Sequence, residues 1–375
     1  MNFEFSDEQN QLRDHAQRFL GERCPPGTVR AILDDPDTPY DRDLWREMAE
    51  LGWTGVTIPE QFGGSGLGYL ELCVIAEELG RSLAPTPYAT SVYLATEALL
   101  RFGSEAQQQK YLPGLAAGET IGTVAVAEGR GVPTPDNLKT TADNNQLSGD
   151  KWPVPDGDVA DFAIVLANDG GDASLMLVDL SDDTISRKTL QSIDPTRSQA
   201  RIAFDRTASE PLGTPGNGWS NLRSLFDRAA VLYAFEQCGG ASAALEMARS
   251  YVTERYAFGR PIGGYQAIKH KLADMYIAAT LARSNCYYGA WALSTDAPEL
   301  PLAAATARVS ATQAYTECSA ENIQAHGGMG FTWEFDCHMY YRRAKALAVN
   351  LGSQSRWEDR LVTALAAEHK MEASA

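Results

Sequence analysis

Hydrophobic residues recur at helical spacing near both ends of the chain, whereas the middle has a different pattern. In the C-terminal part, Leu245, Ala248 and Val252 form one stripe, which predicts the buried face of a helix. The middle contains short apolar runs, such as 162–166 and 175–178, separated by clusters of Gly, Asp, Asn and Pro. This pattern predicts antiparallel strands. The expected order of elements is therefore helical, β and helical.

This order predicts three domains. We expect an N-terminal helical domain over 1–118, a β-domain over 119–212 and a C-terminal helical bundle domain over 213–375. The predicted fold class is mainly α with a central β-domain, because runs of helices and runs of strands are segregated along the chain.

Composition and charge narrow the range of functions. The chain has 375 residues, with 32 Lys and Arg against 49 Asp and Glu, and a formal net charge of -17. Its hydrophobic content of 44% can build a core, which excludes a disordered protein. An acidic protein releases few counterions on phosphate, and this argues against a nucleic-acid partner. Any anionic ligand therefore requires a local positive site.

Several other classes lack their sequence signals. Polar residues interrupt every apolar stretch well before about 18 residues, so no membrane span is expected. The acidic N-terminus has neither a signal-peptide nor a transit-peptide pattern, which makes the cytoplasm the expected location. Six scattered cysteines without a C-x-x-C pair predict core residues rather than a zinc site or a disulfide framework. Zincin, α/β-hydrolase, phosphate-loop and Rossmann motifs are absent, so no metal site is predicted.

Two segments combine polar side chains with turns. In residues 254–274, Arg255 ends one helix and Gln266 opens the next, a donor pair suited to a diphosphate or an amide. The alternative is a helix-hairpin turn with a solvated arginine. In residues 324–333, Gln324 precedes three glycines within four positions, which lets the backbone approach a ligand closely. The alternative is a tight passage between helices.

Together and in this order, the two segments resemble those of acyl-CoA dehydrogenases. Further matches are the Ile-Pro-Glu-Gln-Phe-Gly-Gly motif at 58–64, Glu-Glu-Leu-Gly at 77–80 and Gly-Asp-Lys-Trp at 149–152, so the likeness covers nearly the whole chain. The resemblance implies the acyl-CoA dehydrogenase fold, with a helical N-domain, an antiparallel β-domain and a C-terminal four-helix bundle. It also implies FAD as cofactor, an acyl-CoA substrate and tetramers built as a dimer of dimers.

The resemblance assigns cofactor contacts to particular residues. In such enzymes a neighbouring subunit holds the diphosphate and adenine end of FAD, and an aromatic residue lies against the flavin ring. Trp152 matches the aromatic position. The residues that match the contacts lent to the neighbour are Arg255, Phe258, Gln266, Gln324, Gly327 and Gly328.

The resemblance fails at the catalytic base. The family reaction removes an α-proton with a glutamate while a hydride leaves the β-carbon for the flavin, yet the two positions that supply this glutamate fall on Leu351 and Ala229. Glu236 is a weak candidate for a replacement base, because it lies seven residues beyond position 229, about 10.5 Å along a helix axis. Asp227 and Arg228 are candidate substrate contacts.

The flavin-facing side is altered as well. The loop that touches flavin and thioester in the family is replaced here by 127–136, and the Trp-Ile-Thr motif becomes Trp-Pro-Val-Pro at 152–155, which keeps the aromatic ring but loses the hydroxyl. The contacts that a subunit lends to its neighbour therefore survive, while those for its own flavin and substrate are degraded.

Three hypotheses follow. The first is the base-less, diphosphate-contributing subunit of an α2β2 heterotetramer with a paralogous acyl-CoA dehydrogenase, which resembles heteromeric bacterial enzymes of steroid degradation. The second is a homotetrameric acyl-CoA dehydrogenase with an atypical base, and the third is a flavin-free thioester-binding or scaffold subunit. Both a dehydrogenase and an oxidase are compatible with the residues, and the resemblance implies an electron-transfer flavoprotein as electron acceptor.

Overall fold

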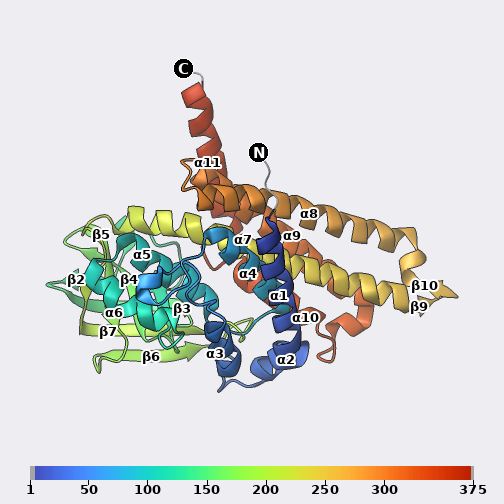
Figure 1. Ribbon diagram of the computed structural model, residues 1–375, viewed down its shortest axis with the longest axis horizontal. Helices are drawn as coiled ribbons and strands as arrows, with labels where there is room; N and C mark the ends of the chain where they lie inside the picture. Colours follow the sequence, from blue (N-terminus) through green and yellow to red (C-terminus); the bar gives the residue numbers. More distant parts are fainter. Residues whose placement is uncertain (1–4, 373–375) are drawn as a thin grey trace. The chain divides into compact units, whose positions relative to one another are not determined.

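Figure 1 shows the computed structural model, which describes residues 5–372. By its internal contacts the chain divides into two compact units. The helical unit comprises the described residues of 1–29, 69–84 and 230–375, and the mixed unit comprises 30–68 and 85–229. The fold is mainly helical with one large sheet, as predicted. The three-domain division of the sequence stays a prediction, because the two units describe packing alone.

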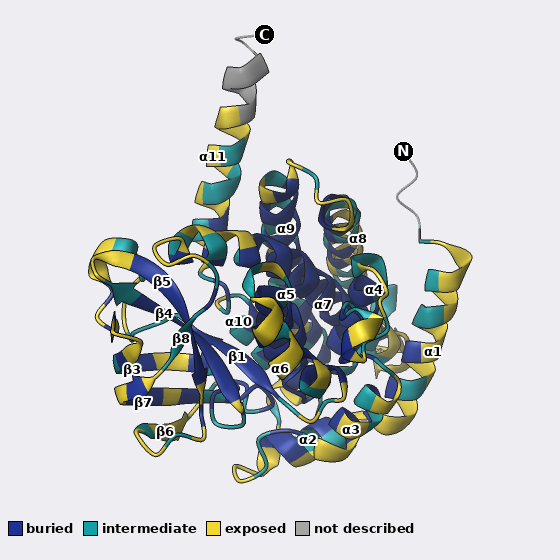
Figure 2. Cartoon of the chain, turned by 60° about the vertical axis from the view of Figure 1, so that its left-hand side comes forward, coloured by how far each residue is buried: buried dark blue, intermediate teal, exposed yellow. Residues whose placement is uncertain are grey.

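The helical unit is built from long helices that carry the expected periodicity. The short elements at their ends are the hairpin β9 (Tyr256–Ala257) and β10 (Arg260–Pro261), η4 (Ile262–Gly264) and η5 (Gly327–Phe331). Its helices are α1 (Asp7–Arg23), the start of α2 (Pro26–Asp34), α4 (Tyr69–Ser82), most of α7 (Gly218–Glu254), α8 (Gln266–Ser294), α9 (Leu300–His326), α10 (Cys337–Leu347) and α11 (Gln354–Glu372). Figure 2 shows buried residues along α7 and α9.

Helices α4 and α7 pack backbone to backbone at two glycines. A Cβ on Gly80 would lie 1.8 Å from the carbonyl oxygen of Glu236, and a Cβ on Gly239 would lie 1.8 Å from that of Glu77. A side chain at either position has no space, because real Cβ contacts are essentially never that short. Glycine at these two positions is therefore what permits this crossing.

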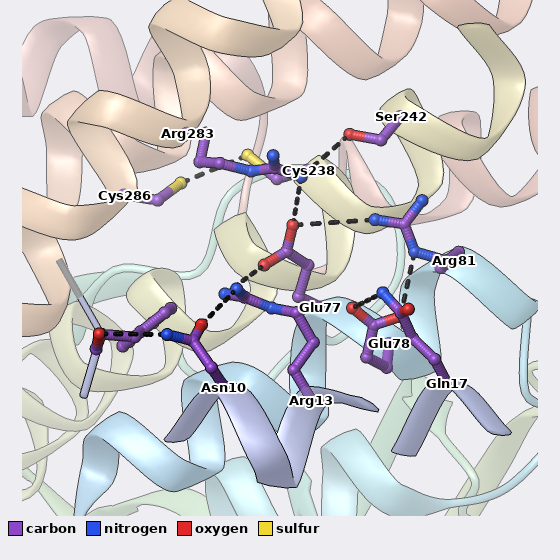
Figure 3. Close-up of polar contacts among 11 residues, drawn as sticks. Asn10, Arg13, Gln17, Glu77, Glu78, Arg81, Cys238, Ser242, Arg283 and Cys286 are labelled. Atoms are coloured by element: carbon purple, nitrogen blue, oxygen red, sulfur yellow. Dashed lines mark hydrogen bonds and ion pairs between the residues drawn. The ribbon is translucent and has the colours of Figure 1, made fainter. Parts of the chain in front are cut away.

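Three arginines surround the carboxylate of Glu77 beside this crossing (Figure 3). Glu77 is buried, and its carboxylate pairs with Arg283 of α8, lies 3.6 Å from Arg13 of α1 and 4.0 Å from Arg81 of α4. Arg283 also donates to the Ser242 hydroxyl of α7. A buried carboxylate is costly unless it is paired, so this cluster favours one arrangement of four helices.

The mixed unit holds the sheet, whose strand order is β6-β7-β3-β2-β4-β5-β8 with β1 paired to β4. Its strands are β1 (Gly122–Ala125), β2 (Thr141–Asp143), β3 (Gln146–Pro155), β4 (Phe162–Asp169), β5 (Asp172–Asp179), β6 (Ile185–Leu190), β7 (Gln199–Ala208) and β8 (Glu210–Pro211). Its helical elements are α3 (Arg42–Glu50), η1 (Glu60–Phe62), the π-helix η2 (Ala89–Thr96), α5 (Glu97–Phe102), α6 (Glu105–Ala116), η3 (Pro135–Asn137) and the parts of α2 and α7 outside the helical unit.

The prediction of a purely antiparallel sheet is wrong in one respect. Strands β1 and β2 each pair in parallel with β4, while the other pairings are antiparallel. Parallel neighbours require a long connection, and the segment between β1 and β4 that contains β2 and β3 provides one for β1. Short apolar runs give no information on strand direction, which explains the difference.

The remaining general expectations concern membranes and cysteines. Within residues 5–372, none of the helices combines the length and the apolar character needed to cross a membrane. All six cysteines are free and buried, as expected for core residues, and Cys238 Sγ lies 3.4 Å from Cys286 Sγ. The described part of the chain contains no group of three ligating side chains that could hold a metal.

A buried acid connects η2 to the sheet of the mixed unit. Asp156 follows β3 and accepts hydrogen bonds from the Thr90 hydroxyl at 2.8 Å and the Ser198 hydroxyl at 3.3 Å. Burial raises the pKa of Asp156 from 3.8 to about 6, although nearby Arg197 and the hydroxyls oppose the increase. The ionised acid therefore weakens the folded state near neutral pH.

Replacing Gly239 with Ala should destabilise the helical unit, because the added methyl group meets a backbone carbonyl. We expect a loss of about 3 kcal/mol in the free energy of unfolding, at the upper end of overpacking costs. The matched control is Gly21→Ala on α1, where no atom lies within 4 Å of the new Cβ; it should stabilise by about 0.5–1 kcal/mol through helix propensity. Urea unfolding followed by circular dichroism measures the stability of both variants. Equal stability of the two would contradict the close backbone contact between α4 and α7.

Replacing Asp156 with Asn should change how stability depends on pH. Because the folded pKa lies above the ordinary value, the stability linked to Asp156 is complete below about pH 3.8 and is lost as pH rises through about 6. The advantage of Asp156→Asn over the native chain should therefore grow by up to about 3 kcal/mol between pH 4 and pH 7. Urea unfolding across this range tests it, with exposed Asp205→Asn as control, and a pH-independent difference would contradict the assignment.

Candidate functional site

The first polar segment forms a fixed turn at the end of α7. The backbone of Phe258 has a φ of 51°, and Gly259 follows with a φ of 82°, so the hairpin reverses sharply. The Tyr265 hydroxyl donates to the Ala257 carbonyl oxygen at 3.0 Å, and the Arg260 guanidinium stacks over the Tyr265 ring. These contacts fix a turn that exposes the side chains of Arg255, Phe258 and Gln266.

The second polar segment follows the end of α9. Gly327 has a φ of 60° and begins η5, and no atom lies within 4 Å of a Cβ built on Gly327 or Gly328. The backbone here is thus open to a ligand, and Gln324 is exposed beside it. His326 is buried, with its Nδ1 atom 2.8 Å from the Asn322 carbonyl oxygen.

An aromatic stack brings the two segments together. The ring of Tyr251, one turn before Arg255 on α7, stacks on the ring of His326 with 4.1 Å between centroids, and Phe335 packs edge-on against both rings. Both predicted cofactor-binding segments therefore lie at the same end of the helical unit.

Large apolar side chains are exposed on these same segments. Phe258 is 95% exposed and Phe331 is 83% exposed, and Tyr256, Met329 and Trp333 are exposed as well. Exposed aromatic residues gathered around a polar site are typical of a surface that another molecule covers.

The residues at this end have the chemistry to hold an anion such as a diphosphate. It presents the guanidinium of Arg255, the side-chain amides of Gln266 and Gln324, and two glycines with open backbone, which together supply donors for an anion and space for its approach. All these groups are exposed, so a ligand bound here would lie on the outer surface of this unit.

The two positions for a catalytic base are apolar and buried. Leu351 is buried in the loop between α10 and α11, and its carbonyl oxygen accepts a hydrogen bond from Trp357 Nε1 at 3.2 Å. The end of α10 just before this loop is held as well, because Arg308 donates to the carbonyl oxygen of Leu347. Ala229 is fully buried on α7. Neither the leucine nor the alanine side chain can accept a proton.

Glu236, the weak candidate for the base, takes part in a buried ion pair. Its Oε1 atom lies 3.5 Å from Arg343 Nη1, and Arg343 also donates to the Leu83 carbonyl oxygen at 3.2 Å. Arg308 is buried nearby, and burial lowers its pKa to about 10. Cationic partners account for the burial of Glu236 without a role in proton transfer.

Asp227 and Arg228, the candidate substrate contacts, are both buried. Arg228 Nε donates to Glu97 Oε1 at 2.5 Å, and both side chains of this pair lie in the mixed unit. Sequence reasoning missed Glu97, because its partner lies 131 residues away and no motif surrounds it.

Trp152 lies on β3 and keeps 37% of its surface exposed. Its neighbour Lys151 is fully buried, and Lys151 Nζ donates to Glu128 Oε1 at 2.7 Å. Burial lowers the pKa of Lys151, and Glu128 partly offsets this. Burial alone would raise the pKa of Glu128, but hydrogen bonds from Lys151 and two backbone amides outweigh it and lower the pKa. Lys151 lies in the Gly-Asp-Lys-Trp motif and Glu128 in the altered segment 127–136, but the sequence does not show that they pair, since they are 23 residues apart.

A separate pocket of about 380 Å³ lies within the helical unit. Its walls come from α1, α2, α4 and α10 and include Leu20, Met339, Glu78 and Arg81. None of the residues predicted to bind cofactor or substrate lines it.

Comparisons with known proteins agree with this architecture. The family model described as "Acyl-CoA dehydrogenase, N-terminal domain" matches residues 6–119, and "Acyl-CoA dehydrogenase, C-terminal domain" matches residues 216–359. The chain is 34% identical over 348 residues to acyl-CoA dehydrogenase IpdE2 of Mycobacterium tuberculosis, covering 92% of this chain and 94% of the relative.

Two solved structures are similar over almost the whole chain. One, a variant of the "Tcur3481-Tcur3483 steroid ACAD", is 31% identical with a TM-score of 0.88, covering 97% of this chain and 99% of the other. The second, the ChsE4-ChsE5 complex from Mycobacterium tuberculosis, is 28% identical with a TM-score of 0.89, covering 98% and 99%. With both terminal family models matched and a relative above 30% identity, this chain belongs to the acyl-CoA dehydrogenase family.

Proposed function

We propose that this chain is the base-less subunit of a FAD-dependent acyl-CoA dehydrogenase and acts with a paralogous subunit in an α2β2 heterotetramer. One contrast carries the proposal. The residues that match the family's contacts to a neighbouring subunit's FAD are exposed at one end of the helical unit, whereas Leu351 and Ala229, at the positions of the base, are apolar and buried. A subunit that has the lent contacts but no base needs a partner that supplies the base.

The proposed reaction is α,β-desaturation of an acyl-CoA thioester. Bound FAD would supply the flavin that accepts a hydride, and a carboxylate of the paralogue would accept the α-proton. In this chain, Arg255 would bind the diphosphate charge, Gln266 and Gln324 would donate to it, and the backbone at Gly327 and Gly328 would allow close approach. Trp152 would be the one contact to a flavin ring that this chain retains.

Two relatives support a heteromeric assembly and a bulky substrate. One similar structure is described as a steroid enzyme with two named components, and another as a complex of two named proteins. We therefore propose a steroid-derived acyl-CoA as substrate class and an electron-transfer flavoprotein as electron acceptor. The cytoplasm stays its predicted location.

Replacing Arg255 with Ala should weaken FAD binding in the heteromeric complex. Loss of one charge-assisted contact, about 1.5–3 kcal/mol, corresponds to roughly 10- to 100-fold weaker binding. The measurement is FAD per tetramer from flavin absorbance after gel filtration of the co-expressed complex. Arg249→Ala is the matched control, because Arg249 lies in the last turns of α7, six residues before Arg255, and pairs with Glu246 on the surface.

The same measurement on the chain alone tests the assembly. We expect little FAD and no desaturation without the paralogue, and two FAD per tetramer with it. A full complement of FAD together with acyl-CoA turnover by this chain alone would overturn the proposed subunit role.

Replacing Glu236 with Gln should lower stability but not kcat. The change leaves Arg343 buried without its carboxylate partner, and breaking such a pair costs about 3–5 kcal/mol. Thermal unfolding and kcat across pH are measured on the heteromeric complex, with exposed Glu246→Gln on the same helix as control. A loss of kcat by about 100-fold or more at unchanged melting temperature would identify Glu236 as the base instead.

A further inference from the structure

The loop 129–138 of the mixed unit is closed at its neck by a single carboxylate. Glu128, immediately before the loop, accepts hydrogen bonds from the backbone amides of Lys139 at 2.7 Å and Thr140 at 2.9 Å, immediately after it. The side chain of Glu128 thus holds the two ends of the loop together, and we call this point the neck of the loop. Compact surface loops have ends that lie close together in this way.

The loop also has internal structure of its own. Asn137 accepts a hydrogen bond from the Thr134 amide at 2.7 Å and donates to the Val132 carbonyl oxygen at 2.9 Å. Residues 135–137 of the loop form the 3-10 turn η3. These contacts brace the loop internally, and the contacts at its neck connect it to the sheet.

The neck is joined directly to Trp152. The Trp152 amide donates to the Ala127 carbonyl oxygen at 2.8 Å, and the Gly129 amide donates to the Trp152 carbonyl oxygen at 2.7 Å. Gly129 lies against the six-membered part of the Trp152 ring, since a Cβ on Gly129 would lie 2.4 Å from Cζ2. The position of the loop and the orientation of the ring are therefore coupled.

The carboxylate cannot leave the neck without cost. Glu128 also binds Lys151, which is fully buried, and separation would leave an ammonium group inside the sheet without a counter-charge. A partly exposed tryptophan is thus attached to a firmly anchored point of the mixed unit.

We propose that Glu128 is a positioning residue that fixes the loop 129–138 against Trp152, so that the exposed part of the ring forms a rigid platform for a planar heteroaromatic ligand. The identification of that ligand as the isoalloxazine ring of FAD rests on the proposed function. The anchor itself depends only on contacts within the mixed unit.

The experiment compares Lys151→Met with the double variant Glu128→Gln and Lys151→Met in the full chain. Both variants remove the buried ammonium, but only the double variant removes the carboxylate that holds the two amides. Neutral replacement of a buried pair is often tolerated, whereas Lys151→Met leaves the Glu128 carboxylate without its cation, so the double variant is expected to fold with a melting temperature at or above that of Lys151→Met. Asp150→Asn, which breaks the exposed pair with Arg201, is the control on the same strand.

Two readouts are taken on each protein. Riboflavin titration gives the quenching of Trp152 fluorescence, obtained as the difference from the same protein carrying Trp152→Phe. Limited trypsin digestion with mass spectrometry gives the rate of cleavage after Arg130, which is exposed in the loop.

In the native chain, Lys151→Met and Asp150→Asn, we expect riboflavin quenching and slow cleavage. In the double variant we expect about tenfold weaker quenching and about tenfold faster cleavage, as loss of charge-assisted hydrogen bonds predicts. Equal quenching and cleavage in all proteins, or no quenching of Trp152 in the native chain, would overturn the platform.

These outcomes are separable from the proposed function. Full FAD and turnover in the chain alone would overturn the subunit role and leave the anchor intact. Equal behaviour of Lys151→Met and the double variant would overturn the anchor and leave the FAD count per tetramer unchanged.

Discussion

The backbone contact between α4 and α7 is the constraint on which the helical unit depends. Gly80 and Gly239 bring the two helices so close that each glycine faces a carbonyl oxygen of the other helix. Side chains of ordinary size would separate them, and the carboxylate of Glu77 would then lose the arginine of α8 that it meets at the crossing. Burial of that carboxylate is tolerable only with its cationic partners, so close packing and charge pairing require each other.

The packing of the long helices matters because the candidate site is built from their ends. Residues at the end of α7 and at the end of α9 meet through the stack of Tyr251 on His326. Their geometry therefore follows from where the long helices end. The net charge of -17 describes the whole chain, whereas an anion at this candidate site would meet a local guanidinium and the unobstructed backbone of two glycines.

The sequence predicted the parts of the fold that depend on local periodicity. The stripe of Leu245, Ala248 and Val252 predicted a buried face of α7, where Ala248 and Val252 are buried and Leu245 is half-buried. Parallel pairing of β1 with β4 was not predictable, because direction depends on the chain path between strands. The pairs Glu97–Arg228 and Glu236–Arg343 join residues more than 100 positions apart, and only folding brings them together.

The two positions that match the family's catalytic glutamate are both buried. Ala229 is fully buried and Leu351 nearly so, and the backbone around Leu351 is held by Trp357 and, through Leu347, by Arg308. A glutamate introduced at either position would be buried, and burial raises a carboxyl pKa and favours the neutral acid. A carboxylate at either position would act as a base only with a pKa near the working pH. The leucine and alanine side chains at these positions cannot accept a proton, so in this chain the family's two base positions supply no base.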